Sequence, residues 1–298
     1  MNRILKLLAF SLTLVASVFI ELRAETYSFE VGQFEKLKIN GDFNVIFKCL
    51  ADSAGFVSYE ARDGMGDVFS FDLKKDGTLK IQLTDKYWGK PGLPVLHLYS
   101  DFLSGVENSS EESVEVLDLV PCAAFNANQI GNGSITVENL KCTNVTASIT
   151  TGNGSINLSG KCVNANFRML GAGLISADRL SADNVKCSIL GTGSIGCWPL
   201  DNLSVKGIGS TKIYYKGKPN IKKTGGGKLF ELPIDDNLDK YNGTPLESIE
   251  EIEEVTEEVT VVAEDDDDDE VDEEDDDEEE DDEEDDDDNY QTVVTADD

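Results

Sequence analysis

A motif of two glycines followed by alternating apolar and polar residues recurs through the middle of the chain. It reads Gly-Asn-Gly-Ser-Ile at 131–135 and at 152–156, and related copies begin at 171, 191 and 207. The first glycines of successive copies lie 21, 19, 20 and 16 residues apart. A period near 20 indicates a solenoid in which each repeat forms one coil. The turn glycines that we assign are Gly131, Gly133, Gly152, Gly154, Gly171, Gly173, Gly191 and Gly193.

The residues after each glycine pair predict β-strands. Apolar and polar residues alternate there, as in Ile-Thr-Val at 135–137 and Ile-Asn-Leu at 156–158, and this period of two is typical of strands. We therefore predict an all-β fold, a right-handed parallel β-helix-like solenoid with coils of about 20 residues over 111–232. Each Gly-x-Gly is expected to bend the chain between strands through positive φ angles. The residues expected to line up inside are Ile135, Ile156, Ile175 and Ile195.

The preceding part, 25–110, is also predicted to be β-rich. Alternating runs flank Asn40-Gly41 and Asp76-Gly77, and such dipeptides between strands are hairpin signals. His97 lies in a further strand, where alternation places it on one face with Val95 and Tyr99. We interpret this histidine, which is the only one in the chain, as structural.

The N-terminus is typical of a secretory signal peptide. Arg3 and Lys6 precede an uncharged apolar run from 7 to 20, and small Ala24 follows it. The run is shorter than the roughly 20 residues that span a membrane. We therefore assign 1–24 to a signal peptide that is cleaved after Ala24. The protein is expected to be exported to the periplasm, the outer-membrane surface or the extracellular space.

Export bears on the cysteines, because disulfides form in oxidising compartments. Cys122, Cys142 and Cys162 are spaced by 20 residues each time and are expected to stack at one corner of successive coils. Coils roughly 4.8 Å apart would allow one neighbouring pair to form a disulfide. Our preferred interpretation is that most of the six cysteines are buried thiols.

Charge divides the chain into two parts. The whole sequence has 59 Asp and Glu against 25 Lys and Arg, but 33 of the acids lie in 247–298, which has no Lys or Arg. We divide the end into a linker, 233–262, and a disordered acidic low-complexity tail, 263–298. A solvated tail that keeps the protein soluble is the simplest interpretation. Loose divalent-cation binding is the alternative, for which the candidates are Asp265, Asp266, Asp267, Asp268 and Asp269.

The remaining part is nearly neutral, which argues against a nucleic-acid partner. A phosphate-binding role of the Gly-x-Gly motif is also disfavoured, because strand residues follow it where a helix would be needed. Only Glu138 and Asp178 share a coil position, two coils and about 9.6 Å apart, which keeps a polysaccharide lyase or hydrolase as an alternative. We assign no catalytic residue, no cofactor and no fixed metal site.

The chain resembles the head GIN domain family of putative auto-transporter adhesins. The resemblance rests on Phe34–Val45, on 76–81, on the Gly-x-Gly-Ser-Ile series, and on 215–221 and 225–229. It implies an exported bacterial protein with a β-helical fold and a role in adhesion at the cell envelope, and it allows a trimer. The six cysteines and the acidic tail depart from the family pattern.

Three functions follow as hypotheses. The first is a non-catalytic adhesion or scaffold module that binds an unknown glycan or protein ligand through its solenoid surface. The second is the β-helix polysaccharide lyase or hydrolase. The third is binding of divalent cations or of a basic partner through the acidic tail.

Overall fold

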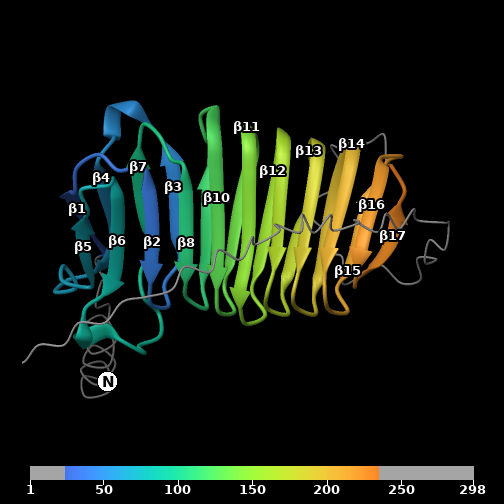
Figure 1. Ribbon diagram of the computed structural model, residues 1–298. Helices are drawn as coiled ribbons and strands as arrows, with labels where there is room; N and C mark the ends of the chain where they lie inside the picture. Colours follow the sequence, from blue (N-terminus) through green and yellow to red (C-terminus); the bar gives the residue numbers. More distant parts are fainter. Residues whose placement is uncertain (1–23, 235–298) are drawn as a thin grey trace, which may run out of the picture. The chain divides into compact units, whose positions relative to one another are not determined.

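A computed structural model describes residues 24–234, and in them long strands stack in parallel to form a β-solenoid (Figure 1). Each strand of the stack pairs in parallel with the next. The predicted solenoid is therefore confirmed. The central strands are β10 (Cys122–Ile130), β11 (Ser134–Thr151), β12 (Ser155–Met169), β13 (Leu174–Ile189) and β14 (Ser194–Gly207).

Each central coil has three sides, because the inward-facing positions fall into three groups. In β11 the buried residues are at 135 and 137, at 140 and 142, and at 145, 147 and 149. We call 134–137 the first side, 140–142 the second side and 144–149 the third side, and use the same names for the register partners in other coils. The corner between the first and second sides contains Asn139, whose φ is +56°.

The interior consists of columns of aliphatic side chains. Ile135 is in register with Ile156, Ile156 with Ile175, and Ile175 with Ile195, and all four are fully buried. Burying one such side chain stabilises a fold by roughly 1.5–3 kcal/mol. One coil cannot bury this face alone, so the stacking of coils is what makes the strands stable.

The same parallel stack continues into the N-terminal residues. β8 pairs with β10 and β9 pairs with β11, and β2 and β3 stack against β8 and β9. At their opposite edges, β2 pairs in parallel with β6 and β3 pairs in parallel with β7. The coil formed by β2 and β3 therefore lies between two coils that come later in the chain. The bounds are β2 (Lys36–Asn40), β3 (Val45–Cys49), β6 (Thr78–Leu83), β7 (Leu96–Ser100), β8 (Gly105–Ser109) and β9 (Ser113–Leu117).

Antiparallel strands occur at this end of the stack. β1 (Ala24–Glu30) pairs with β4 (Phe56–Arg62), β4 pairs with β7, and β5 (Phe69–Leu73) pairs with β6. The hairpin predicted at Asp76-Gly77 is thus confirmed. The one predicted at Asn40-Gly41 is wrong, because β2 and β3 pair with other strands and lie on different sides of one coil. Two short 3-10 helices are also present, η1 (Ala51–Ser53) and η2 (Asp85–Tyr87).

Shorter strands complete the other end of the solenoid. β15 (Lys212–Lys216) and β16 (Asn220–Gly225) pair in parallel with different sides of β14, and β17 (Lys228–Leu232) pairs with β15. The part of the chain that the structure describes contains no helix long and apolar enough to cross a membrane.

The Gly-x-Gly motifs form the corner between the third side and the next first side. Positive φ angles occur at Gly131 and Gly152, but not at the other six glycines that we assigned as turns. At those positions the reason for glycine is close packing of backbones. A Cβ atom on Gly173 would lie 2.0 Å from the carbonyl oxygen of Gly154, and one on Gly193 would lie 2.2 Å from that of Gly173. The expectation that all eight glycines provide positive φ is therefore corrected.

Candidate functional site

The third side of the solenoid presents a regular polar surface to solvent. In one outward column, Asn126 and Thr146 are followed in register by Asn166, Lys186, Ser204 and Lys222. In the neighbouring column, Asn128 and Ser148 are followed by Arg168, Ser188, Lys206 and Thr224. We call these two columns, from β11 to β16, the cationic face. They contain no acidic residue.

The cations of this face alternate between the two columns. Arg168, Lys186, Lys206 and Lys222 lie on successive coils, and every register neighbour of these cations in the same column is uncharged. All four are exposed. Like charges directly stacked in adjacent strands repel each other, and the alternation avoids this while keeping one positive charge on each coil.

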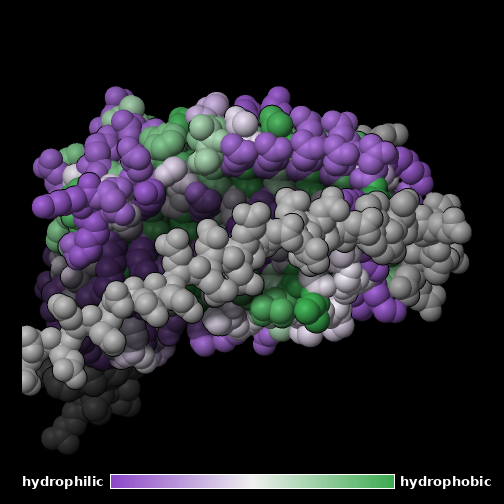
Figure 2. Space-filling view, viewed as in Figure 1, coloured by the Kyte–Doolittle hydropathy of each residue, from purple (hydrophilic) through white to green (hydrophobic). Residues whose placement is uncertain are grey.

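A ladder of asparagines borders the cationic face. Asn164 donates from Nδ2 to Oδ1 of Asn144 at 3.0 Å, Asn184 to Asn164 at 3.2 Å, and Asn202 to Asn184 at 2.8 Å. Figure 2 shows a row of hydrophilic residues along the top of β11 to β14, where the third side begins. This ladder was not predicted from the sequence. Its signal is the recurrence of Asn at 144, 164, 184 and 202.

The same side continues into the N-terminal coils as a groove of about 390 Å³. Its lining includes Lys36 and Lys38 from β2, and Asn126 and Asn128 from β10. Lys38 forms an ion pair with Glu107 of β8, with 2.6 Å between Nζ and Oε1. Polar and cationic groups therefore extend along the third side beyond the cationic face.

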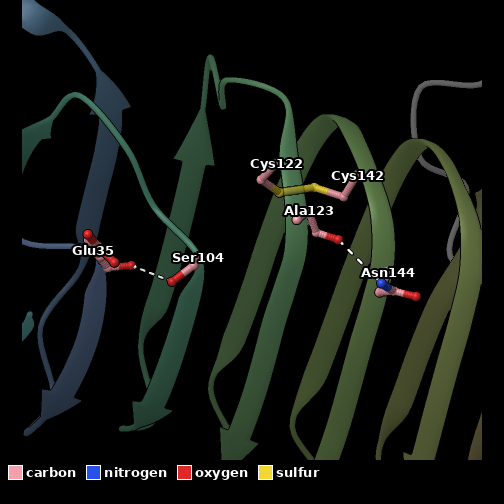
Figure 3. The surroundings of a disulfide bond; sticks show 6 residues. All are labelled: Glu35, Ser104, Cys122, Ala123, Cys142 and Asn144. Carbon is pink, nitrogen blue, oxygen red and sulfur yellow. Dashed lines mark hydrogen bonds between the residues drawn. A yellow bond between two sulfur atoms is a disulfide. The ribbon is translucent and has the colours of Figure 1, made fainter. Parts of the chain in front are cut away.

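A disulfide bond joins Cys122 and Cys142, which are register partners on the second side of two successive coils (Figure 3). Cys162 of β12 is the register partner of Cys142 in the next coil. It remains a free, buried thiol. Burial raises the pKa of Cys162 to about 12, and the charge of Asp183 contributes in the same direction. Close to the disulfide, Asn144 donates to the backbone carbonyl of Ala123 at 3.5 Å.

The two carboxylates that could have formed a hydrolase pair, Glu138 and Asp178, lie in different environments. Asp178 is nearly buried, accepts from Ser176 Oγ at 3.1 Å and forms an ion pair with Lys216 at 3.3 Å. Lys216 also donates to the backbone carbonyl of Asp178 at 2.9 Å. Glu138 is exposed. A carboxylate held by a buried lysine is a structural group, so the arrangement gives no support to a general acid and base at these positions.

His97 and the candidate metal ligands are not part of the cationic face as defined above. His97 lines a groove with Val95 and Tyr99, as alternation predicted, together with residues from β1 and β4. The described residues 24–234 hold no cluster of His, Cys, Asp and Glu that could bind a metal. The proposed cation ligands Asp265–Asp269 lie outside that range. Cleavage after Ala24 also stays a prediction.

The Gly-x-Gly corner carries an exposed aliphatic ridge next to the cationic face. Leu170, Leu190 and Ile208 follow one another on successive coils, and 47%, 66% and 76% of their surfaces are exposed. Figure 2 shows hydrophobic residues at the lower edge of the molecule, below β12 to β14. The ridge distinguishes this corner from the polar columns beside it.

Solved structures from Bacteroides and Parabacteroides species share this fold. A putative adhesin from Bacteroides fragilis is 21% identical with a TM-score of 0.60, and the match covers 71% of this chain and 96% of that one. A putative adhesin from Parabacteroides merdae is 19% identical (TM-score 0.55; 72% and 98% covered). A putative lipid binding protein from Parabacteroides distasonis is 20% identical (TM-score 0.55; 72% and 98% covered). These identities establish similarity of fold alone.

A comparison with curated proteins finds no match. A family model, described as putative auto-transporter adhesin, head GIN domain, matches residues 33–219. This range includes β2 to β15 and the cationic face up to Lys206. The chain therefore belongs to the family of putative auto-transporter adhesins with a head GIN domain.

Proposed function

We propose that this protein is a non-catalytic adhesion module that is exported to the cell envelope and binds a glycan or protein ligand on the third side of its solenoid. Membership of an adhesin family supports the general role. The observation that carries the choice of site is the cationic face with its bordering asparagine ladder. It offers polar side chains at every coil, as amides, hydroxyls or cations, and successive coils are about 4.8 Å apart.

The rigidity of the scaffold supports this assignment. The outward residues of the third side alternate with fully buried ones, such as Ala147 and Phe167, so each outward side chain begins from a fixed backbone position. A ligand that contacts such a surface loses less free energy to ordering of the protein. Each single contact is weak, and a repeated surface adds many of them along an extended ligand.

The test uses the full-length protein and two matched variants of β11. Thr146→Tyr places a bulky side chain on the cationic face, and Thr136→Tyr places the same side chain outward on the first side. Binding is measured by surface plasmon resonance to immobilised dextran, mannan, polygalacturonate and collagen. We expect Thr146→Tyr to weaken binding to the recognised surface at least about fivefold, whereas Thr136→Tyr binds as the unmodified protein does.

Adhesion of cells provides the second measurement. Cells that lack the gene should attach less well to the recognised surface, and the unmodified gene should restore attachment. If the protein binds none of the four surfaces, or if both tyrosine variants bind equally well, the proposed site is wrong.

A further inference from the structure

The four alternating cations point to a particular class of ligand. We propose that the cationic face binds an acidic polysaccharide, a chain whose sugar rings carry carboxylate or sulfate groups, laid along the solenoid axis. This inference rests on the proposed function and specifies its ligand.

Segregation of charge is the first argument. Between residues 24 and 234 the chain carries 22 Asp and Glu and 21 Lys and Arg, so the described part as a whole is almost neutral. The two columns of the cationic face nevertheless carry four cations and no acid. Charges of one sign that gather on one surface favour a partner of the opposite sign.

Spacing is the second argument. The cations occur once per coil over β12, β13, β14 and β16, so positive charges recur about every 4.8 Å along the axis. A pyranose ring in an extended polysaccharide has a similar length. An acidic sugar on each coil would therefore meet one cation each time, on alternate sides of the bound chain.

The uncharged neighbours are the third argument. Asn166, Ser188 and Ser204 lie beside the cations in the same columns, and the amides of Asn164 and Asn184 border them. Amides and hydroxyls donate to and accept from sugar hydroxyls. No aromatic residue occurs in the two columns, so this face lacks the stacking platform on which proteins commonly hold the bases of single-stranded nucleic acids.

Salt screens the repulsion between an acidic ligand and the large negative charge of the whole chain. The formal net charge is −34, but the Debye length at 0.15 M ionic strength is only about 8 Å. Affinity should fall when salt is raised further, because the attraction is between solvent-exposed charges.

The experiment compares dextran sulfate with uncharged dextran, which has the same backbone. Full-length protein is titrated with each polymer at 0.15 M salt, and the binding is followed by calorimetry. The double variant Arg168→Gln with Lys206→Gln removes two cations from one column. Lys141→Gln with Lys161→Gln removes two exposed cations from the second side and is the matched control.

We expect dextran sulfate to bind and dextran to bind at least about tenfold more weakly. Two exposed ion pairs contribute modestly, so the Arg168 and Lys206 variant should lose roughly fivefold in affinity for dextran sulfate while the control loses less than about twofold. A polygalacturonate titration with the same outcome extends the result from sulfate to carboxylate.

Three results would overturn the inference. The first is equal binding of dextran and dextran sulfate, and the second is an equal loss in the two double variants. The third is a double-stranded DNA oligomer that binds as tightly as dextran sulfate through the same two cations, which would indicate a general polyanion surface. Each of these leaves the proposed function standing if Thr146→Tyr, unlike Thr136→Tyr, still weakens binding to one of the four immobilised surfaces, so the two failures are distinguishable.

Discussion

Asn184 bridges two neighbouring coils, because it donates to Asn164 at 3.2 Å and accepts from Asn202 at 2.8 Å. Each of these side chains therefore fixes the position of one coil relative to the next. The ladder runs along the boundary of the cationic face, so it keeps the outward columns in register as well as joining the coils.

Interrupting the ladder in its middle should weaken the solenoid measurably. Asn184→Ala removes one donor and one acceptor, and net hydrogen-bond contributions near 1 kcal/mol predict a loss of about 1–2 kcal/mol in the free energy of unfolding. Urea denaturation followed by circular dichroism measures it. Ser188→Ala on the same strand is the control and should change stability by less than about 0.5 kcal/mol. Equal effects of the two substitutions would show that the ladder is not stabilising.

Close backbone packing at the Gly-x-Gly corner predicts a larger effect. In Gly173→Ala the new methyl group would lie 2.0 Å from the carbonyl oxygen of Gly154, so the coils must separate. We expect a loss of about 3 kcal/mol or more in the free energy of unfolding. Gly64→Ala is the control, since Gly64 has a φ of +81° with nothing within 4 Å, and strain alone should cost about 1 kcal/mol. A smaller loss for Gly173→Ala than for Gly64→Ala would argue against the stacked corner.

The disulfide pairing can be tested by counting free thiols in the denatured protein. Because Cys122 is bonded to Cys142, Cys162→Ser should show one thiol fewer than the unmodified protein, and Cys142→Ser should show one more. The disulfide closes a loop between two cysteines that are 20 residues apart in the sequence. Removing the bond should lower the free energy of unfolding by about 3 kcal/mol. If Cys162→Ser instead gains a thiol, Cys142 is bonded to Cys162.

Alkaline pH should destabilise the fold partly through Cys162. Burial raises the pKa of this thiol from 9.0 to about 12, so the folded state keeps its proton at pH values where the unfolded state releases it. The unfolded state then binds fewer protons, and the free energy of unfolding falls as pH rises from about 9 toward 12. Unfolding curves at pH 8, 9 and 10.5 should show a smaller decline in Cys162→Ala. An unchanged decline would show that the thiol does not contribute.

Local patterns in the sequence predicted the solenoid and its interior. Alternation of apolar and polar residues depends only on neighbours in the chain, and the period near 20 places equivalent residues on successive coils. For this reason Ile135, Ile156, Ile175 and Ile195 could be predicted to form an inward column, which the structure confirms.

Such local patterns do not predict where the corners between the three sides of a coil lie. Alternation restarts after each bend, as it does after Asn139, so the sequence does not show which outward residues of one coil share a surface with those of the next. The cationic face and the asparagine ladder could not be predicted, because both require the alignment of outward residues between coils to be known. The prediction of positive φ failed at Gly173 and Gly193 for a related reason, since their packing partners are backbone atoms of another coil.

The sequence by itself determined that the chain repeats, that its strands bury one face, and that Cys122, Cys142 and Cys162 form one column. Tertiary structure decided which two of these cysteines bond and that the coil of β2 and β3 lies between later coils. It also decided that four cations gather on one side. Each of these outcomes depends on the register between segments far apart in the chain. The contacts that stabilise this register form only when the coils stack.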